Sequence, residues 1–274
     1  MATQTTALSR PIAPASAGLL LPAFTLWWRE IVRFYRQKTR VIGVIASPLV
    51  FWVVIGSGFG SSFRSGAAGQ QHYMDYFYPG ALIMIVLFTS IFTMMSVIED
   101  RKEGFLLSVL VAPVPRSAIV LGKVLGGTTL SAAQGMIFLV FAPFANVHLN
   151  LPQVLMVAVV VFLVSFALTA LGFAIAWRMD STQAFHGIIN LFLIPLWMLS
   201  GAMFPIAKAS SWIRALMYMN PLTYGVEALR ALLYPEMEAT FPLPSAMATL
   251  LLFSLVMFGL AFLMANRRST RPAA

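Results

Sequence analysis

Six stretches of the sequence carry no Asp, Glu, Lys or Arg, and this feature constrains the fold more than any other. Each stretch is rich in aliphatic and aromatic residues and supplies the ~20 apolar residues with which a helix crosses a bilayer. The stretches are 41–63, 76–98, 124–147, 151–177, 181–207 and 239–266. They predict an all-α integral membrane protein whose transmembrane domain, residues 41–266, contains six spanning helices.

The composition indicates the same class of protein. Hydrophobic residues make up 59% of the chain and charged residues only 10%, which is typical of a membrane protein. The net charge of +9 is explained by Lys and Arg in cytoplasmic loops, so we expect membrane lipids and no nucleic acid as partners. The absence of cysteine excludes disulfides, thiol catalysis and Cys-ligated metals.

The N-terminal region divides into two parts. Residues 1–23 are rich in Ala, Thr, Ser and Pro and predict a loose arm. In residues 24–40, Arg29, Arg33 and Arg36 fall on one stripe of a helix, opposite a face of aromatic and aliphatic residues. This pattern predicts an amphipathic helix in the headgroup layer. Two interpretations stay open: a plain interfacial anchor, or an anchor that also helps to cradle a partner subunit.

The distribution of basic residues predicts the orientation of the chain. If both termini are cytoplasmic, the outside set is Arg64, Lys208, Arg214 and Arg230, which leaves 14 of the 18 basic residues inside. This bias favours cytoplasmic termini, with residues 267–274 as a cytoplasmic tail. In the third span, Gly122 and Gly126 form a small-xxx-small pattern that allows close helix packing.

The longest outside segment, 208–238, is too apolar for a free loop and too short to span the membrane. Asn220 and Pro221 divide it into two helical patterns, 211–219 and 223–233. We expect short re-entrant or interfacial helices at the outer face. Glu227 and Arg230 are spaced i,i+3 and are positioned to pair with each other.

A charged segment follows the second span. Residues 99–103 read Glu-Asp-Arg-Lys-Glu, and a short apolar helical pattern, 105–112, ends at the Pro-Val-Pro sequence 113–115. Five adjacent charges are too costly in lipid, and the basic residues favour the cytoplasmic face. We interpret the segment as a contact surface for a separate soluble protein; a solvated charged loop is the alternative.

Several kinds of chemistry are missing from the sequence. No charged residue lies at the centre of a span, which argues against an ion gradient as the energy source. Gly122-Lys123 lacks the glycine-rich lead of a P-loop, so we predict no ATP site in this chain. The three histidines are scattered, and no nucleophile elbow is present, so we predict no metal site, no cofactor and no hydrolase. We therefore expect a transport subunit and not an enzyme.

Two motifs resemble those of the ABC-2 type permease family. One comprises Asp100-Arg101, Glu103-Gly104, Leu110-Val111-Ala112-Pro113-Val114, Arg116 and Ile119 to Lys123, and the other runs from Asn220-Pro221 through Glu227 to Arg230. The resemblance covers nearly the whole chain. Members of this family are membrane subunits of bacterial exporters for drugs, lipid conjugates and polysaccharides.

The resemblance implies partners and site residues. It implies a dimer of permeases, expected here as a homodimer, with two separate ABC-type subunits that bind ATP and Mg. It also implies that residues 99–112 form a coupling helix in a cleft of the ATPase, with Arg29, Arg33 and Arg36 beside that cleft. The residues assigned to this contact are Glu99, Asp100, Arg101, Glu103, Gly104, Leu110, Pro113 and Arg116.

We therefore expect the permease subunit of an ATP-driven exporter of an amphiphilic drug or lipid-like molecule in the bacterial inner membrane. Export of a lipid-linked saccharide is an alternative, and a gradient-driven carrier, a channel or a scaffold are others. Polar and aromatic side chains of the second and fifth spans are candidates for the substrate path, with helix–helix hydrogen bonding as their alternative role. These candidates are Thr89, Ser90, Thr93, Asn190, Trp197 and Ser200.

Overall fold

The computed structural model describes residues 18–58, 73–236 and 239–267. Every regular element in these residues is a helix. The bundle helices are α2 (Lys38–Gly58), α4 (Tyr73–Thr93), α7 (Arg116–Phe138), α8 (Leu151–Ala176), α9 (Thr182–Trp197) and α12 (Leu243–Asn266). The remaining helices are α1 (Leu20–Arg36), α5 (Met95–Lys102), α6 (Phe105–Val111), α10 (Ser211–Met219) and α11 (Pro221–Leu233), with the helical turns Leu139–Ala145, Met198–Ala202 and Ile206–Lys208.

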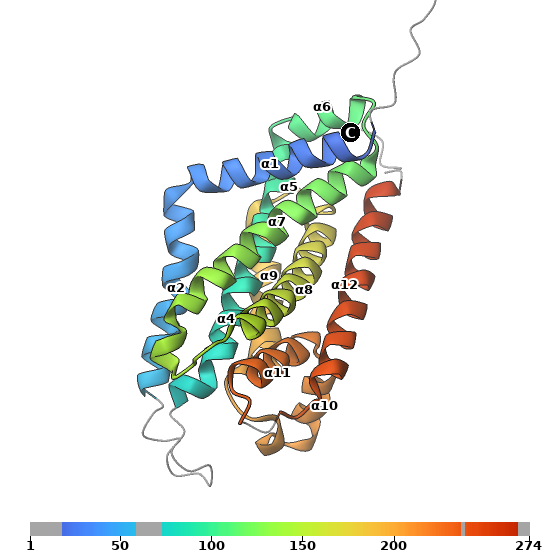
Figure 1. Ribbon diagram of the computed structural model, residues 1–274. Helices are drawn as coiled ribbons and strands as arrows, with labels where there is room; N and C mark the ends of the chain where they lie inside the picture. Colours follow the sequence, from blue (N-terminus) through green and yellow to red (C-terminus); the bar gives the residue numbers. More distant parts are fainter. Residues whose placement is uncertain (1–17, 59–72, 237–238, 268–274) are drawn as a thin grey trace, which may run out of the picture.

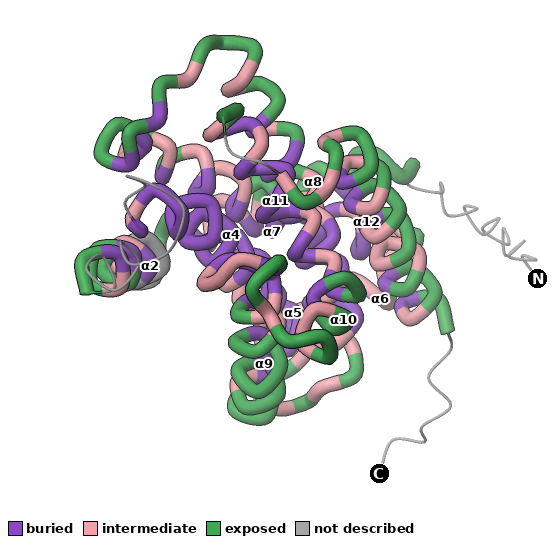
Figure 2. Tube along the Cα trace, turned by 90° about the horizontal axis from the view of Figure 1, so that it is seen from below, coloured by how far each residue is buried: buried purple, intermediate pink, exposed green. Residues whose placement is uncertain are grey.

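The bundle helices run up and down, and α5 continues α4 toward one end (Figure 1). Helices α1 and α6 lie at one end, and α10 and α11 at the other. Helix α4 occupies the middle of the bundle and is buried along nearly its whole length, as the view along the bundle shows (Figure 2). Both ends of the described chain lie at the end that carries α1 and α6 (Figure 1).

Five helical segments are long and apolar enough to cross a membrane, counted over the described residues. They are Tyr73–Lys102, Arg116–Ala145, Leu151–Ala176, Thr182–Ala202 and Leu243–Asn266. The predicted all-α integral membrane class is therefore confirmed. The remaining predicted span, 41–63, extends past Gly58 into residues outside the described ranges, so six crossings stay a prediction. Its described part, α2, lies beside α4, where Trp52 Nε1 donates to the Met74 carbonyl oxygen at 3.1 Å.

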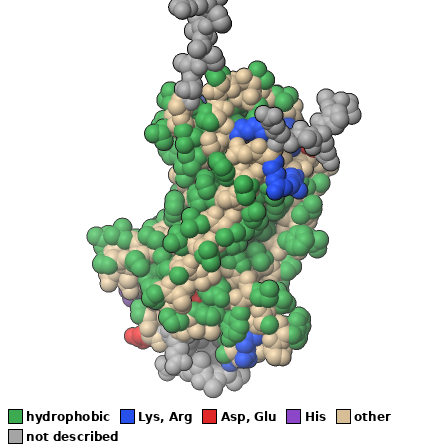
Figure 3. All heavy atoms as spheres, turned by 90° about the vertical axis from the view of Figure 1, so that its right-hand side faces the viewer, with side chains coloured by type: hydrophobic (Ala, Val, Ile, Leu, Met, Phe, Trp, Pro, Cys, Tyr) green, Lys and Arg blue, Asp and Glu red, His purple; other side chains and the backbone are tan. Residues whose placement is uncertain are grey.

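The surface agrees with this class. Apolar side chains cover the middle of the face shown in Figure 3, and Lys and Arg gather toward its two ends. Because lipid tails solvate apolar side chains and water solvates charged ones, this distribution is expected for a chain that spans a bilayer.

The amphipathic helix differs from its predicted bounds, 24–40. Helix α1 begins at Leu20 and ends at Arg36, and Gln37, with φ −93° and ψ 71°, makes a corner before α2 begins at Lys38. The predicted arm, 1–23, is correspondingly shorter, and residues 1–17 lie outside the described ranges, as do most residues of the predicted tail, 267–274. No Gly or Pro marks the corner, so the amphipathic pattern continues past it.

The outer helices follow the sequence pattern closely. Helix α10 covers residues 211–219 as predicted, and α11 begins at Pro221, two residues before the predicted start. Asn220 caps α11 by accepting a hydrogen bond from the backbone N–H of Leu222 at 3.0 Å. Proline suits the first turn of a helix because its nitrogen needs no partner there, which accounts for the earlier start.

Candidate functional site

Helix α1 packs against α7 at very close range. A Cβ atom at Gly122 would lie 2.7 Å from the carbonyl oxygen of Ala23, and a Cβ atom at Gly126 would lie 2.8 Å from the Cβ atom of Glu30. Only glycine therefore permits this approach. The predicted small-xxx-small packing is confirmed, and the element packed against it is the amphipathic helix α1.

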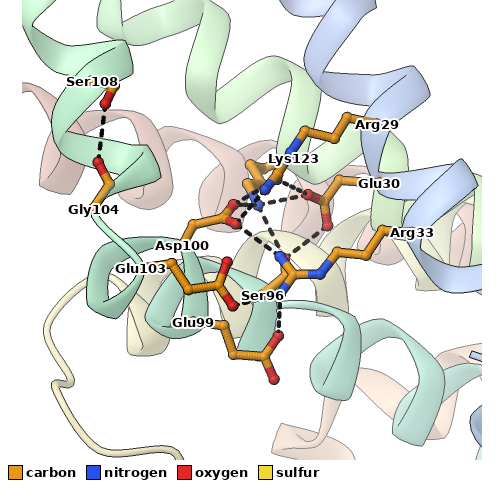
Figure 4. Close-up of polar contacts among 10 residues, drawn as sticks. All are labelled: Arg29, Glu30, Arg33, Ser96, Glu99, Asp100, Glu103, Gly104, Ser108 and Lys123. Carbon is orange, nitrogen blue, oxygen red and sulfur yellow. Dashed lines mark hydrogen bonds and ion pairs between the residues drawn. The ribbon is translucent and has the colours of Figure 1, made fainter.

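A buried lysine lies between these two glycines. Lys123 Nζ donates to Glu30 Oε1 at 2.6 Å and to Ser96 Oγ at 3.1 Å, and it also pairs with the carboxylate of Asp100 (Figure 4). Ser96 Oγ donates to the second carboxylate oxygen of Glu30 at 2.7 Å. The side chains of Lys123, Asp100 and Glu30 are only 1%, 0% and 4% exposed. These contacts join α1, α5 and α7 through buried charges.

Two arginines of α1 bind the same carboxylates. Arg29 contacts both oxygens of Asp100, at 2.9 and 2.8 Å, a bidentate geometry that is strong and directional. Arg33 donates to Asp100 at 2.8 Å and to Glu99 at 2.7 Å, and Glu103 lies 3.8 Å from it. Burial lowers the pKa of Arg29, but the hydrogen bond and charge of Asp100 outweigh it and hold that pKa above its usual value. Arg29 therefore stays charged.

Three cations and three carboxylates form the centre of this arrangement, which we call the charged cluster; the exposed Glu103 lies at its edge. Its cations are Arg29, Arg33 and Lys123, its carboxylates are Glu30, Glu99 and Asp100, and Ser96 bridges them. Removing one member of such a group leaves an uncompensated buried charge, which is strongly destabilising. The cluster therefore fixes the relative positions of α1, α5 and α7.

Helix α6 is attached to the same unit. The guanidinium carbon of Arg29 lies 3.8 Å from the centroid of the Phe105 ring, a cation–π contact. Leu26 of α1, Leu106 of α6 and Ile119 of α7 form a small apolar core beside it. These contacts hold α6 to α1 and α7, so the three helices move together.

The predicted coupling helix, 99–112, is not one helix. Helix α5 ends at Lys102, and α6 runs from Phe105 to Val111. Gly104 separates them with φ +77°, a left-handed conformation that glycine adopts without a steric penalty. The segment is therefore a helical end and a separate short helix, joined by a sharp turn.

The residues predicted to contact an ATPase divide into two groups. Glu103 and Pro113 are exposed near α6, together with Lys102, Leu107 (61%) and Val111 (88%). Asp100 is fully buried in the charged cluster, Glu99, Gly104 and Leu110 are half-buried, and Arg36 at the end of α1 is exposed. The surface that α6 offers to another protein is therefore largely apolar.

Arg101 and Arg116 turn toward this chain's own helix ends. Arg101 donates to the carbonyl oxygens of Met179 at 3.0 Å and Trp177 at 2.5 Å, and to Asp180 at 3.0 Å, at the end of α8. Arg116 donates to the Ala265 carbonyl oxygen at 3.1 Å, in the last turn of α12. Cations at helix C-termini satisfy free carbonyl groups and complement the helix dipole. These two arginines anchor the ends of the segment that carries α6.

Most candidates for the substrate path lie inside the bundle. Thr89 Oγ1 is 2.5 Å from Gln134 Oε1, Ser90 donates to Ser131 at 2.8 Å, and Thr93 donates to the Ser90 carbonyl oxygen at 2.8 Å. Buried hydroxyls that bond between helices in this way stabilise a membrane bundle. Thr89 and Ser90 therefore make the helix–helix hydrogen bonds that were their alternative role, whereas Thr93 bonds within α4.

The candidates of the fifth span differ from one another. Trp197 Nε1 donates to the Gly80 carbonyl oxygen at 2.8 Å, and Ser200 Oγ donates to the Trp197 carbonyl oxygen at 2.6 Å. Both residues are buried, whereas Asn190 is exposed on α9. The exposed face of α9 around Asn190 is apolar and includes Leu191 and Phe192.

An apolar cavity of about 360 Å³ lies between α2, α4 and α9. Its lining residues are all uncharged and include four aromatic rings. They are Gly43, Pro48, Phe51, Met84, Phe88, Phe92, Ile194 and Trp197. Such a wall accommodates a hydrophobic or aromatic group of a ligand.

At the opposite end, Glu227 and Arg230 of α11 form an ion pair, as their spacing predicted. Both side chains are nearly fully buried. Asn220 donates from Nδ2 to the Leu196 carbonyl oxygen at 2.6 Å, so the helix cap also holds the fifth span.

Comparisons with known proteins agree with this architecture. A family model described as "ABC-2 type transporter" matches residues 23–234. This match covers most of the chain. The chain belongs to the ABC-2 type transporter family.

Individual relatives have low sequence identity to this chain but align with it over most of its length. The inner membrane transport permease YadH of Escherichia coli K12 is 29% identical over 75% of this chain and 80% of its own length. The daunorubicin resistance ABC transporter permease protein DrrB1 of Streptomyces coeruleorubidus is 24% identical over 84% and 81%. The ycf38 protein of Cyanophora paradoxa is 27% identical over 76% and 73%.

Membership in the ABC-2 family confirms the predicted resemblance and the coarse function. The chain is a multi-pass membrane protein and the membrane subunit of an ABC transporter. ABC-2 subunits form the transport part and normally work with an ABC ATP-binding subunit, so the chain is not itself the catalytic enzyme.

Sequence analysis missed three members of the charged cluster: Glu30, Ser96 and Lys123. Lys123 was assigned to the family motif and to the cytoplasmic basic residues, but not to a buried ion pair. A signal was present, because Lys123 lies between Gly122 and Gly126, on a helix face that the glycines predict to be in close contact. A charged residue on such a face requires a partner of opposite charge.

Proposed function

We propose that this ABC-2 chain forms the transmembrane path of an ATP-driven exporter for an aromatic amphiphile, and that α6 couples it to a separate ATP-binding subunit. In this proposal two copies of the chain and two ATPase subunits make up the complex. The ATPases bind ATP and Mg, and the chain lies in the bacterial inner membrane with both termini in the cytoplasm.

The observation that carries the proposal is the construction of α6. Leu107 and Val111 project from the end of the bundle, while Phe105 and Leu106 are held by α1 and α7. An exposed apolar tip on a fixed base suits a contact that transmits a rigid-body movement. The charged cluster would pass that movement to α1, and Gln37 would pass it to α2, which forms one wall of the apolar cavity.

The cavity supports the choice of substrate class. The lining presents the aromatic rings of Phe51, Phe88, Phe92 and Trp197. It has no charged group to bind the hydroxyl-rich surface of a saccharide. The name of the relative DrrB1 refers to daunorubicin, a drug, which fits the same class. The exposed apolar face of α9 supports a second copy as the opposite wall of the path.

The coupling contact is tested by Leu107→Asp in α6, with Leu216→Asp in α10 as the matched control. Both leucines are exposed, but they lie at opposite ends of the bundle. In inverted membrane vesicles with the ATP-binding subunit, we expect Leu107→Asp to reduce ATP-dependent export at least about tenfold, because a charge replaces an apolar anchor. The control is expected to keep assembly and export. Unchanged assembly and export for Leu107→Asp would contradict the proposed coupling contact.

The substrate class is tested by Phe88→Trp, which fills the cavity, against Phe162→Trp on the exposed face of α8. The probes are daunorubicin, a lysophospholipid and a lipid-linked oligosaccharide. We expect daunorubicin to stimulate the ATPase of the complex, and Phe88→Trp alone to weaken that stimulation. Stimulation by the saccharide alone would overturn the proposed class.

A further inference from the structure

The fifth span is broken where the apolar cavity ends. Helix α9 stops at Trp197, and the turn Met198–Ala202 that follows has non-helical angles at Leu199 and Gly201. Gly201 has φ +78°, in the left-handed region. A break of this kind frees backbone carbonyl groups, which need new partners at membrane depth because lipid offers none.

Side chains of two other helices supply these partners. The Gly201 carbonyl oxygen accepts hydrogen bonds from Arg230 Nη2 at 2.9 Å and from the Tyr76 hydroxyl at 2.8 Å. The Met203 carbonyl oxygen accepts one from the Tyr73 hydroxyl at 2.9 Å. The broken turn is thus bonded to α4 on one side and to α11 on the other.

Arg230 makes one of these three hydrogen bonds and also contacts two further side chains. Its guanidinium carbon lies 4.3 Å from the centroid of the Tyr76 ring, and the group pairs with Glu227. The second carboxylate oxygen of Glu227 accepts a hydrogen bond from the backbone N–H of Thr240 at 2.7 Å, just before α12. A single buried cation therefore joins the broken turn, α4, α11 and the chain leading into α12.

The break adjoins the cavity directly. Trp197 lines the cavity and also accepts, through its carbonyl oxygen, the hydrogen bond of Ser200 at 2.6 Å. The broken turn therefore begins at the cavity wall and continues toward the end of the bundle that carries α10 and α11 (Figure 1).

We propose that Arg230 is a positioning residue that latches the broken turn Met198–Ala202 to α11, beside the Tyr76 ring of α4, and so closes the cavity at the α10–α11 end. When Arg230 releases the Gly201 carbonyl oxygen, the turn loses this bond to α11 and the cavity opens toward that end. This inference rests on the proposed function only for the identity of the molecule that passes through the opened cavity. The closure itself is a property of this chain.

The test uses the absence of cysteine from the chain. Ser200→Cys places one thiol on the broken turn, at a side chain that is fully buried. Full-length chain in lipid nanodiscs is treated with a membrane-impermeant maleimide, which reaches both faces, and the labelling rate is measured. No ATPase and no substrate are present, so failure of this test is distinct from failure of the proposed transport function.

We expect Arg230→Gln to raise the labelling rate of the Ser200→Cys chain at least about tenfold, because it removes a charge-assisted hydrogen bond and an ion pair. Arg230→Lys is expected to restore part of the protection. The matched control is Arg214→Gln, which removes another arginine from the same end: Arg214 bonds the Ala207 and Ala209 carbonyl oxygens, away from Gly201. This control is expected to leave the rate unchanged.

A second thiol distinguishes local release from general loosening. Ser165→Cys lies in the buried core of α8 and is expected to stay protected in the Arg230→Gln chain. Three results would each overturn the proposal. They are an equal rise in the labelling rates of Ser165→Cys and Ser200→Cys in the Arg230→Gln chain, an equal rise at Ser200→Cys in the Arg214→Gln chain, and an unchanged rate at Ser200→Cys in the Arg230→Gln chain. If Arg230→Gln does not assemble, Tyr76→Phe decides, because it removes only one hydrogen bond to Gly201. Its expected effect is about threefold, and an unchanged rate overturns the latch.

Discussion

The two ends of the bundle both bury charges, but they use them differently. At the α1–α6 end, six charged side chains bind one another across three helices. At the α10–α11 end, Glu227 and Arg230 form a buried ion pair, and four further hydrogen bonds lead to backbone carbonyl groups in and beside a broken helix. The first arrangement resists separation of the helices, because any separation leaves several buried charges unpaired. The second is lost one hydrogen bond at a time, which suits a part that opens.

Lys123→Met gives the largest expected effect. It leaves Glu30 and Asp100 buried without their central cation, so we expect a loss of about 3–5 kcal/mol in the free energy of unfolding. Chemical unfolding in mixed micelles measures this, with exposed Lys102→Met as the control. If the two variants unfold alike, the charged cluster does not hold this end together.

Gly126→Leu tests the close contact of α1 and α7 without changing a charge. The added side chain would meet Glu30, so we expect a loss of about 1–3 kcal/mol from overpacking. Gly259→Leu on α12 is the control, because a Cβ atom there would have no neighbour within 4 Å. Equal stabilities in the same unfolding assay would show that α1 can shift on α7 at little cost.

Thr223→Val probes the opposite end and has the smallest expected effect. The buried Thr223 hydroxyl donates to the Met217 carbonyl oxygen at 2.6 Å, and its loss is expected to cost about 1 kcal/mol. Thr249→Val, which loses only a bond within its own helix to Ser245, is the control. A cost for Thr223→Val as large as that of Lys123→Met would remove the difference between the two ends.

The sequence predicted the features that depend on neighbours along the chain. The bounds of α10, the separation of α10 from α11 at Asn220-Pro221 and the pair Glu227–Arg230 all follow from local spacing. The class of fold followed from uncharged stretches of membrane length. These signals are local, so one sequence is enough to read them.

The contacts of the charged cluster could not be predicted in the same way. Helical spacing shows that Arg29 and Arg33 share a face, but not that the face meets Asp100, about 70 residues away along the chain. The stripe of arginines therefore predicted acidic lipid or a partner protein, whereas the structure pairs two of the three with this chain's own carboxylates. The break at Gly201 also escaped prediction, because a lone glycine in an apolar span resembles ordinary helix packing.

The corner at Gln37 has a mechanical consequence. One non-helical residue, Gln37, separates α1 from α2, and the two helices run in clearly different directions (Figure 1). A movement of α1 along the plane of the membrane therefore tilts α2, which runs through the depth of the membrane. The stiffness of the backbone at Gln37 therefore sets how much of a movement of α1 reaches the aromatic lining of the cavity. A glycine inserted after Gln37 would make this link flexible and weaken the transmission.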